Sequence, residues 1–127
     1  MNTKKEFEKN IYLLTNKLQV GLFDEVIPGV KKLLKVSKDQ ILFNILSLAY
    51  QGKGDYDKSI ELLKKAIKSD QKNIFFLNNI GLSYFKKGDL KNAEYYLKKA
   101  IEINPKYINS LNNYANLKKE LNQFDEA

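Results

Sequence analysis

The sequence of 127 residues contains neither cysteine nor histidine. Without cysteine, the chain can form no disulfide and offers no thiolate nucleophile and no cysteine-based zinc site. Without histidine, it lacks the usual general base and the commonest metal ligand. Glycine-rich phosphate loops and metal-ligand spacings are also missing. The sequence therefore predicts a protein that is not an enzyme and that uses no metal and no cofactor.

Long hydrophobic runs are missing as well. The longest apolar-rich run, residues 41–50, is interrupted by Asn44 and Ser47 and is far too short to cross a bilayer. Near the charged N-terminus only four apolar residues stand together, which is too few for the core of a signal peptide. These observations predict a cytoplasmic protein without a membrane span.

Arginine is also absent, so all 22 basic residues are lysines, and the formal net charge is +7. Nucleic-acid recognition usually relies on arginine, whose forked guanidinium matches phosphates and guanine edges. Lysine, asparagine and isoleucine are abundant together, which indicates a general compositional bias. A nucleic-acid partner is therefore not expected, and binding through lysines alone would show a steep salt dependence.

What the sequence does contain is an internal repeat with a period of about 34 residues. The clearest unit, residues 73–106, reads as two short helices with a break at Lys87 and Gly88. Shifting this unit by one period toward the N-terminus superimposes Tyr84 on Tyr50 and Gly88 on Gly54. The predicted repeats are 7–39, which is divergent, 40–73, 74–107 and 108–127, which is incomplete.

Glycine and aspartate mark the break inside each repeat. We expect Gly54 and Gly88 to end the first helix of their repeats, where a left-handed residue is favoured. Asp55 and Asp89 follow directly, and aspartate is a preferred cap for the N-terminus of a helix. The pattern predicts a tight turn between two antiparallel helices.

Small residues and tyrosines recur at the positions where the helices of a repeat should meet. Ser47, Gly81 and Ala115 are expected where the first helix approaches its partner closely. Tyr50 and Tyr84 are expected to fill the space between helices with a large amphipathic ring. The pattern predicts an interface within each repeat, so stacked repeats would share one continuous core.

The first and last repeats depart from the pattern. Asn10 stands where the next repeat has Phe43, and Pro28 falls inside the second helix, where it should bend the helix or force a late start. The chain stops at Ala127, on the first turn of the second helix of its repeat. We therefore expect the chain to be an N-terminal part of a longer protein; the alternative is a native terminus with a frayed last helix.

This pattern resembles the tetratricopeptide repeat over nearly the whole chain, weakly over the first twenty residues. The residues that carry the resemblance are Leu77, Ile80, Gly81, Tyr84, Ala93, Leu97, Ala100 and Pro105. The family often has tryptophan where Leu77 stands and phenylalanine where Leu97 stands. The resemblance implies one all-α solenoid over residues 1–127, built from antiparallel helix pairs wound into a right-handed superhelix, whose first helices line a concave groove.

The resemblance places a set of candidate peptide-binding residues in that groove. Asn44, Asn78 and Asn112 recur at one-period intervals, so they would form a ladder of amides. An amide offers one acceptor and two donors, which suits the backbone of an extended peptide. The ladder is similar to the one in the repeat domain of O-linked N-acetylglucosamine transferase; the alternative is that these asparagines simply face solvent. The full predicted set is Asn44, Leu48, Asn78, Asn79, Leu82, Phe85, Asn112, Asn113 and Asn116.

Apolar residues beside the asparagines would supply side-chain pockets. Leu48, Leu82 and Phe85 are expected to keep some exposure, whereas Ile41, Ile45 and Phe75 are expected mainly to pack between repeats. Some members of the family hold a C-terminal carboxylate with basic groove residues. The comparable positions here carry Asn44, Leu48, Asn79, Asn109 and Asn113, so a carboxylate clamp is not expected.

The predicted function is that of a protein-interaction scaffold that binds an extended peptide or a partner helix in the concave groove. The alternative is the non-catalytic N-terminal repeat region of a larger glycosyltransferase or sulfotransferase, with any catalytic domain beyond residue 127. Self-association is expected as well if the last repeat leaves its apolar face uncovered, a face formed by Leu111, Tyr114, Leu121 and Phe124.

Overall fold

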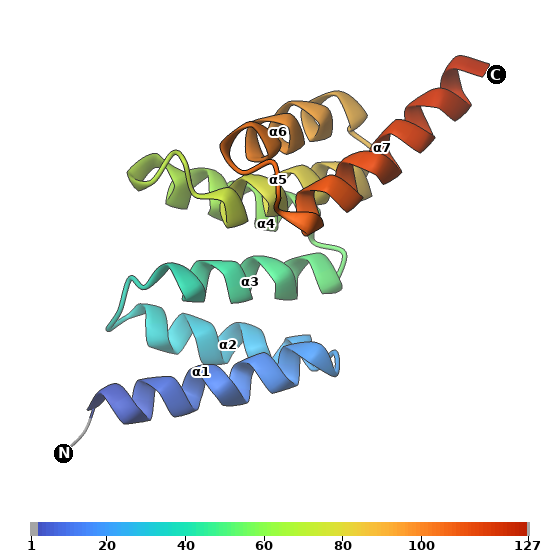
Figure 1. The fold of residues 1–127 in the computed structure, drawn as a ribbon. Helices are drawn as coiled ribbons and strands as arrows, with labels where there is room; N and C mark the ends of the chain where they lie inside the picture. The colour runs from blue at the N-terminus through green and yellow to red at the C-terminus, as the bar shows by residue number, and fades with distance from the viewer. Residues whose placement is uncertain (1–2, 127) are drawn as a thin grey trace.

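The structure, a computed structural model, describes residues 3–126, with side chains described as far as residue 123. These residues contain no strand and no helix that is long and apolar enough to cross a membrane. The prediction of an all-α protein is confirmed. The helices of Figure 1 are α1 (Thr3–Gln19), α2 (Phe23–Leu34), α3 (Gln40–Gly52), α4 (Tyr56–Ala66), the short 3₁₀ helix η1 (Ile67–Ser69), α5 (Ile74–Lys87), α6 (Leu90–Ile103) and α7 (Ile108–Glu126).

The helices form antiparallel pairs that stack on one another (Figure 1). α1 pairs with α2, α3 with α4, and α5 with α6, while α3, α5 and α7 each also pack on the preceding pair. One core cluster joins α1 to α3 around Val26 and Leu42, and a second joins α4 to α7 around Ile80, Leu97 and Leu117. Because each pair buries its apolar stripe against its neighbours, the fold is the predicted α-solenoid.

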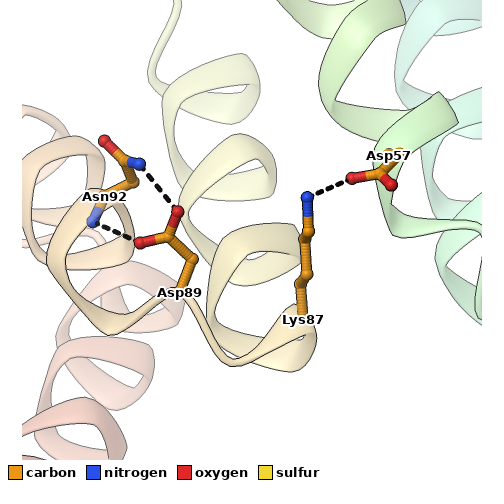
Figure 2. Close-up of polar contacts among 4 residues, drawn as sticks. All are labelled: Asp57, Lys87, Asp89 and Asn92. Atoms are coloured by element: carbon orange, nitrogen blue, oxygen red, sulfur yellow. Dashed lines mark hydrogen bonds and ion pairs between the residues drawn. The ribbon is translucent and has the colours of Figure 1, made fainter.

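The predicted turn is present inside the two central repeats. Gly54 and Gly88 have φ values of 83° and 96°, in the left-handed region that favours glycine. The Asp89 carboxylate accepts from the backbone N–H of Asn92 at 3.2 Å and from its side-chain amide at 2.7 Å, as Figure 2 shows. These hydrogen bonds hold the pKa of the Asp89 carboxyl below its ordinary value. Asp89 is therefore a cap, as predicted.

Asp55 is a correction to the predicted caps. It occupies the N-cap position of α4, but its side chain makes no capping hydrogen bond. In α6 the second bond to Asp89 comes from the amide of Asn92, whereas the residue at the same place in α4 is Lys58. A lysine has no amide at that distance, and the Lys58 ammonium lies 5.8 Å from the centre of the Tyr50 ring instead.

The close approach of helices at small residues is found in the two central repeats. A Cβ atom added to Gly81 would lie 2.7 Å from Cγ of Leu97, so only glycine fits there without a shift of the neighbour. Ser47 is fully buried, and the Tyr84 ring stacks on Tyr96 with centroids 5.7 Å apart. Ala115, by contrast, is exposed, which contradicts its predicted role.

The exposure of Ala115 follows from the course of α7. The sequence predicts a break near the residue that corresponds to Gly88, but α7 continues from Ile108 to Glu126 without interruption (Figure 1). The corresponding residue is Asn122, and no non-glycine residue among those described has a positive φ. Without a left-handed residue the helix does not turn, so no second helix returns onto Ala115 in the described part of the chain.

Of the two effects predicted for Pro28, a bend or a late start of the second helix, the late start is not found. α2 begins at Phe23, so the proline does not force a late start and lies inside the helix. Proline has no N–H to donate to the carbonyl of Asp24, four residues earlier. This loss is tolerable because Val26 and Val30, on either side of Pro28, are completely buried against α1 and α3.

Matching ion pairs connect successive repeats near the turns between paired helices. The Lys53 ammonium, at the end of α3, lies 2.6 Å from the Asp24 carboxylate at the start of α2. One repeat later, Lys87 at the end of α5 pairs with Asp57 at the start of α4, as Figure 2 shows. In each pair the hydrogen bond to the aspartate, followed by its charge, raises the pKa of the lysine.

Candidate functional site

The successive first helices enclose a hollow of about 450 Å³ on one side of the stack. α3 and α5 form two of its walls, and α7 with the residues just before it forms the third. The described lining combines asparagines with apolar and aromatic residues and contains no charged side chain. The lining residues are Asn44, Leu48, Phe75, Asn78, Asn79, Leu82, Tyr107, Asn109, Asn112 and Asn113.

Seven of the nine residues predicted for the groove line this hollow. The other two do not: Phe85 packs against the second core cluster, and Asn116 is an exposed residue of α7 outside the lining. The seven are Asn44, Leu48, Asn78, Asn79, Leu82, Asn112 and Asn113.

Sequence reasoning missed two aromatic residues of the hollow and left Asn109 out of the predicted set. Phe75 was expected to pack between repeats, yet 52% of its surface is exposed. Its ring meets Tyr107 edge to face, with centroids 5.6 Å apart. Tyr107 precedes α7, in a segment for which the repeat pattern predicts no groove position. Asn109, one of the groove positions without a basic residue, lines the hollow as well.

The asparagines form hydrogen bonds from one repeat to the next. The Asn79 amide donates to Oδ1 of Asn44 at 3.3 Å. Further along the stack, Oδ1 of Asn78 accepts from the Asn113 amide at 3.0 Å and from the Ser110 hydroxyl at 3.0 Å. The bonded asparagines are 35 residues apart, one more than the period. Among the described residues, the predicted ladder of Asn44, Asn78 and Asn112 therefore does not bond to itself.

Each bonded asparagine uses only part of its amide in these contacts. Nδ2 of Asn44 and of Asn78, and Oδ1 of Asn79 and of Asn113, have no hydrogen-bond partner among the described residues. None of the described buried side-chain polar atoms lacks a partner, so these four atoms are accessible to solvent. The side chain of Asn112 makes no hydrogen bond to any residue that the structure describes. The hollow therefore presents both donors and acceptors.

A buried polar network supports the α5 wall from behind. The Gln51 amide donates to the backbone carbonyl of Asn79 at 3.1 Å and to the Ser83 hydroxyl at 2.8 Å. Ser83 in turn shares a hydrogen bond of 3.0 Å with Ser59 on α4. All three side chains are buried. A satisfied network of this kind fixes the position of the helices that carry it, so Asn79 is held in place from α3 and α4.

The geometry defines a class of protein: a helical-repeat scaffold whose first helices form a polar, uncharged hollow. Family models for the tetratricopeptide repeat, two described as "Tetratricopeptide repeat" and one as "TPR repeat", match residues 74–107, 96–127 and 48–88 respectively. Together they span residues 48–127, and the chain belongs to the tetratricopeptide repeat family. A search of curated protein sequences finds no match.

Solved structures of tetratricopeptide repeat domains share this fold. The Sgt2 domain from Aspergillus fumigatus matches with a TM-score of 0.85 and 18% identity, covering 96% of this chain and 83% of that one. The TPR2AB domain of yeast Sti1, in a complex with pHSP90, matches with a TM-score of 0.83 and 24% identity, covering 96% of this chain and 50% of that one. The type III secretion chaperone SycD of Yersinia enterocolitica, bound to a peptide of the translocator YopD, matches with a TM-score of 0.79 and 21% identity, covering 97% of this chain and 96% of that one.

Proposed function

We propose that this protein is a protein-interaction scaffold that binds an extended peptide segment of a partner in the hollow between α3, α5 and α7. The observation that carries the proposal is the set of unpaired amide donors and acceptors that face the hollow from three successive helices. A peptide backbone offers an alternating series of C=O and N–H groups, which such a surface can satisfy. The similar fold of SycD is bound to a peptide of the translocator YopD, which supports a peptide as the ligand.

The chemistry of the lining indicates what kind of peptide fits. Because no described lining residue is charged, the hollow favours a segment without charged side chains, and we expect little dependence of affinity on salt. Phe75, Leu48 and Leu82 add apolar contact surface for one or two side chains of the peptide. No observation favours the alternative of a repeat region that precedes a transferase domain.

The affinity expected for this hollow is modest. A hydrogen bond contributes a net 0.5–1.5 kcal/mol or so, and several of the amide atoms are already used between the repeats. Three or four bonds to a peptide backbone thus give only a few kcal/mol, roughly the millimolar range. Burial of apolar side chains against Phe75 and Leu82 has to supply the remainder, at about 25 cal/mol per Å².

A selection experiment tests the proposal. A random peptide library would be displayed against the purified protein, and the enriched peptide would be synthesised and titrated by fluorescence anisotropy. We expect Asn112→Ala and Leu82→Ala each to weaken its binding about fivefold or more, the equivalent of about 1 kcal/mol. Asn116→Ala is the matched control, because Asn116 lies on the same helix outside the lining. Unchanged affinity in Asn112→Ala, or failure to enrich any peptide, contradicts the proposal.

A further inference from the structure

A second hollow, of about 540 Å³, lies between α1 and α2, away from the helices that form the first one. Its apolar lining includes Leu13, Leu33 and Val36, of which Leu13 is 45% and Val36 82% exposed. Exposed apolar side chains that border a concave surface mark a site of interaction. Nothing in the peptide groove proposed above uses this surface.

The hollow exists because two large residues of the next repeat are absent from the first. Asn10 stands where the next repeat has Phe43, and Gly29 stands where it has Leu62, in both cases 33 residues later. Both Asn10 and Gly29 line the hollow. The side chain of Leu14 lies against Gly29, where an added Cβ would meet Cδ2 of Leu14 at 2.7 Å. The floor is therefore packed, while the space above it is open.

Lysines stand on both walls of this hollow. Lys17 belongs to α1, Lys32 lies in the last turn of α2, and Lys35 directly follows the end of α2; none of the described lining residues is acidic. Lys17 lies 3.3 Å from the Glu25 carboxylate in an exposed ion pair. Lys32 and Lys35 have no partner within the described part of the chain. An apolar strip with positive charge on both sides is complementary to an apolar stripe with negative charge on both sides.

We propose that the hollow between α1 and α2 binds an acidic amphipathic helix of a partner protein. Along α1 the lining runs from Asn10 to Lys17, which is about 10 Å, or two helical turns, at a rise of 1.5 Å per residue. A helix with apolar residues at i, i+3, i+4 and i+7 presents a stripe of the same length. Glutamates on the two flanks of that stripe reach the lysines of the two walls.

The distribution of charge favours a helix over other anionic amphiphiles. A fatty acid carries its charge at one end and would leave the lysines of one wall without a partner. A helix offers two flanks along its whole length, and helix-in-groove binding is a general mode of peptide recognition. Exposed pairs contribute little each, so the apolar stripe supplies most of the affinity and the lysines select acidic flanks.

The test uses a fluorescein-labelled synthetic helix with leucines at i, i+3, i+4 and i+7 and glutamates beside them, titrated against the full chain. We expect saturable binding that weakens with salt, and about tenfold weaker binding to the double variant Lys32→Glu, Lys35→Glu. The control is Lys91→Glu, Lys119→Glu, which makes the same change of net charge at exposed lysines of α6 and α7. The control variant should bind like the parent protein.

A second variant addresses the hollow without changing its charge. Asn10→Phe introduces the residue that the next repeat has at this place and fills the space above Leu14. It should keep or raise the melting temperature while abolishing binding of the synthetic helix. Equal binding of a helix in which glutamine replaces glutamate, equal loss in the control charge variant, or unchanged binding to Asn10→Phe overturns the proposal. Because these changes leave α3, α5 and α7 intact, their outcome is independent of the peptide groove.

Discussion

At the scale of single residues, the asparagines of the groove have two roles that only the structure separates. Asn78 and Asn79 are nearly buried and connect successive repeats, whereas Asn112 is exposed and unpaired. The sequence predicts that all of them border one groove, since the repeat period carries equivalent residues to equivalent places. It does not predict which amide atoms bond to each other, because that depends on the offset between packed helices.

This separation leads to a prediction about stability. Asn78→Ala removes the acceptor of both the Asn113 amide and the Ser110 hydroxyl, and it leaves the fully buried hydroxyl of Ser110 without a partner. We expect a loss of about 1–3 kcal/mol in the free energy of unfolding, measured by urea denaturation. Asn112→Ala should stay within about 0.5 kcal/mol of the parent protein, as exposed residues do. Equal stabilities for the two variants would show that the hydrogen bonds accepted by Asn78 do not stabilise the fold.

At the scale of helices, the sequence predicts where the helices lie, but it predicts only some of their ends and caps correctly. Gly88 and Asp89 behave as their residue types require, because a positive φ and a capping carboxylate are local properties. Asp55 makes no capping hydrogen bond although it stands at the same place in its repeat, so residue type alone does not decide the cap. The unbroken course of α7 coincides with Asn122 at the place of the glycine, and Asn122 does not adopt the left-handed conformation that ends α5 at Gly88.

The ion pairs between repeats predict a dependence of stability on pH. The aspartates raise the pKa of Lys53 and of Lys87 in the folded protein above the ordinary value of about 10.4. The folded state therefore holds these protons more tightly than the unfolded state. The stabilisation is fully present below the unfolded pKa and is lost as pH rises through the folded one. We expect the urea midpoint to fall between about pH 9.5 and pH 11.5.

The double variant Asp24→Asn, Asp57→Asn isolates this effect. It should have a lower urea midpoint than the parent protein at about pH 9.5, and the two midpoints should converge at about pH 11.5. Tyrosines and the other lysines titrate in both proteins, so they cancel in the difference between the two. A difference that stays constant over this range would show that the two ion pairs contribute nothing through their charge.

At the scale of the whole molecule, the ends of the stack differ from its middle. The predicted uncovered face of the last repeat is partly covered: Tyr114 and Leu121 pack against the second core cluster, and only Leu111 is plainly exposed, at 40%. Phe124 lies outside the residues whose side chains are described. The sequence shows which face a helix uses for stacking, but not how far its neighbours cover that face.

The remaining exposed apolar residues of α7 predict weak self-association. Ile108, 67% exposed, and Leu111 lie within one helical turn on a helix that projects from the stack (Figure 1). We expect the weight-average mass in sedimentation equilibrium to rise with protein concentration, and Ile108→Gln with Leu111→Gln to reduce that rise. A mass that stays at the monomer value at high concentration would count against this prediction.

We predict that α7 is an easily opened wall of the proposed peptide groove. In a linear array each unit is held only by its neighbours, and among the described side chains of α7 only Ser110 and Leu117 are fully buried. One wall of the hollow comes from this helix and the residue before it. Local opening of α7 below the global melting temperature would therefore remove one wall of the groove while α1 to α4 remain folded. A bound peptide would contact α7 and stabilise it against this opening.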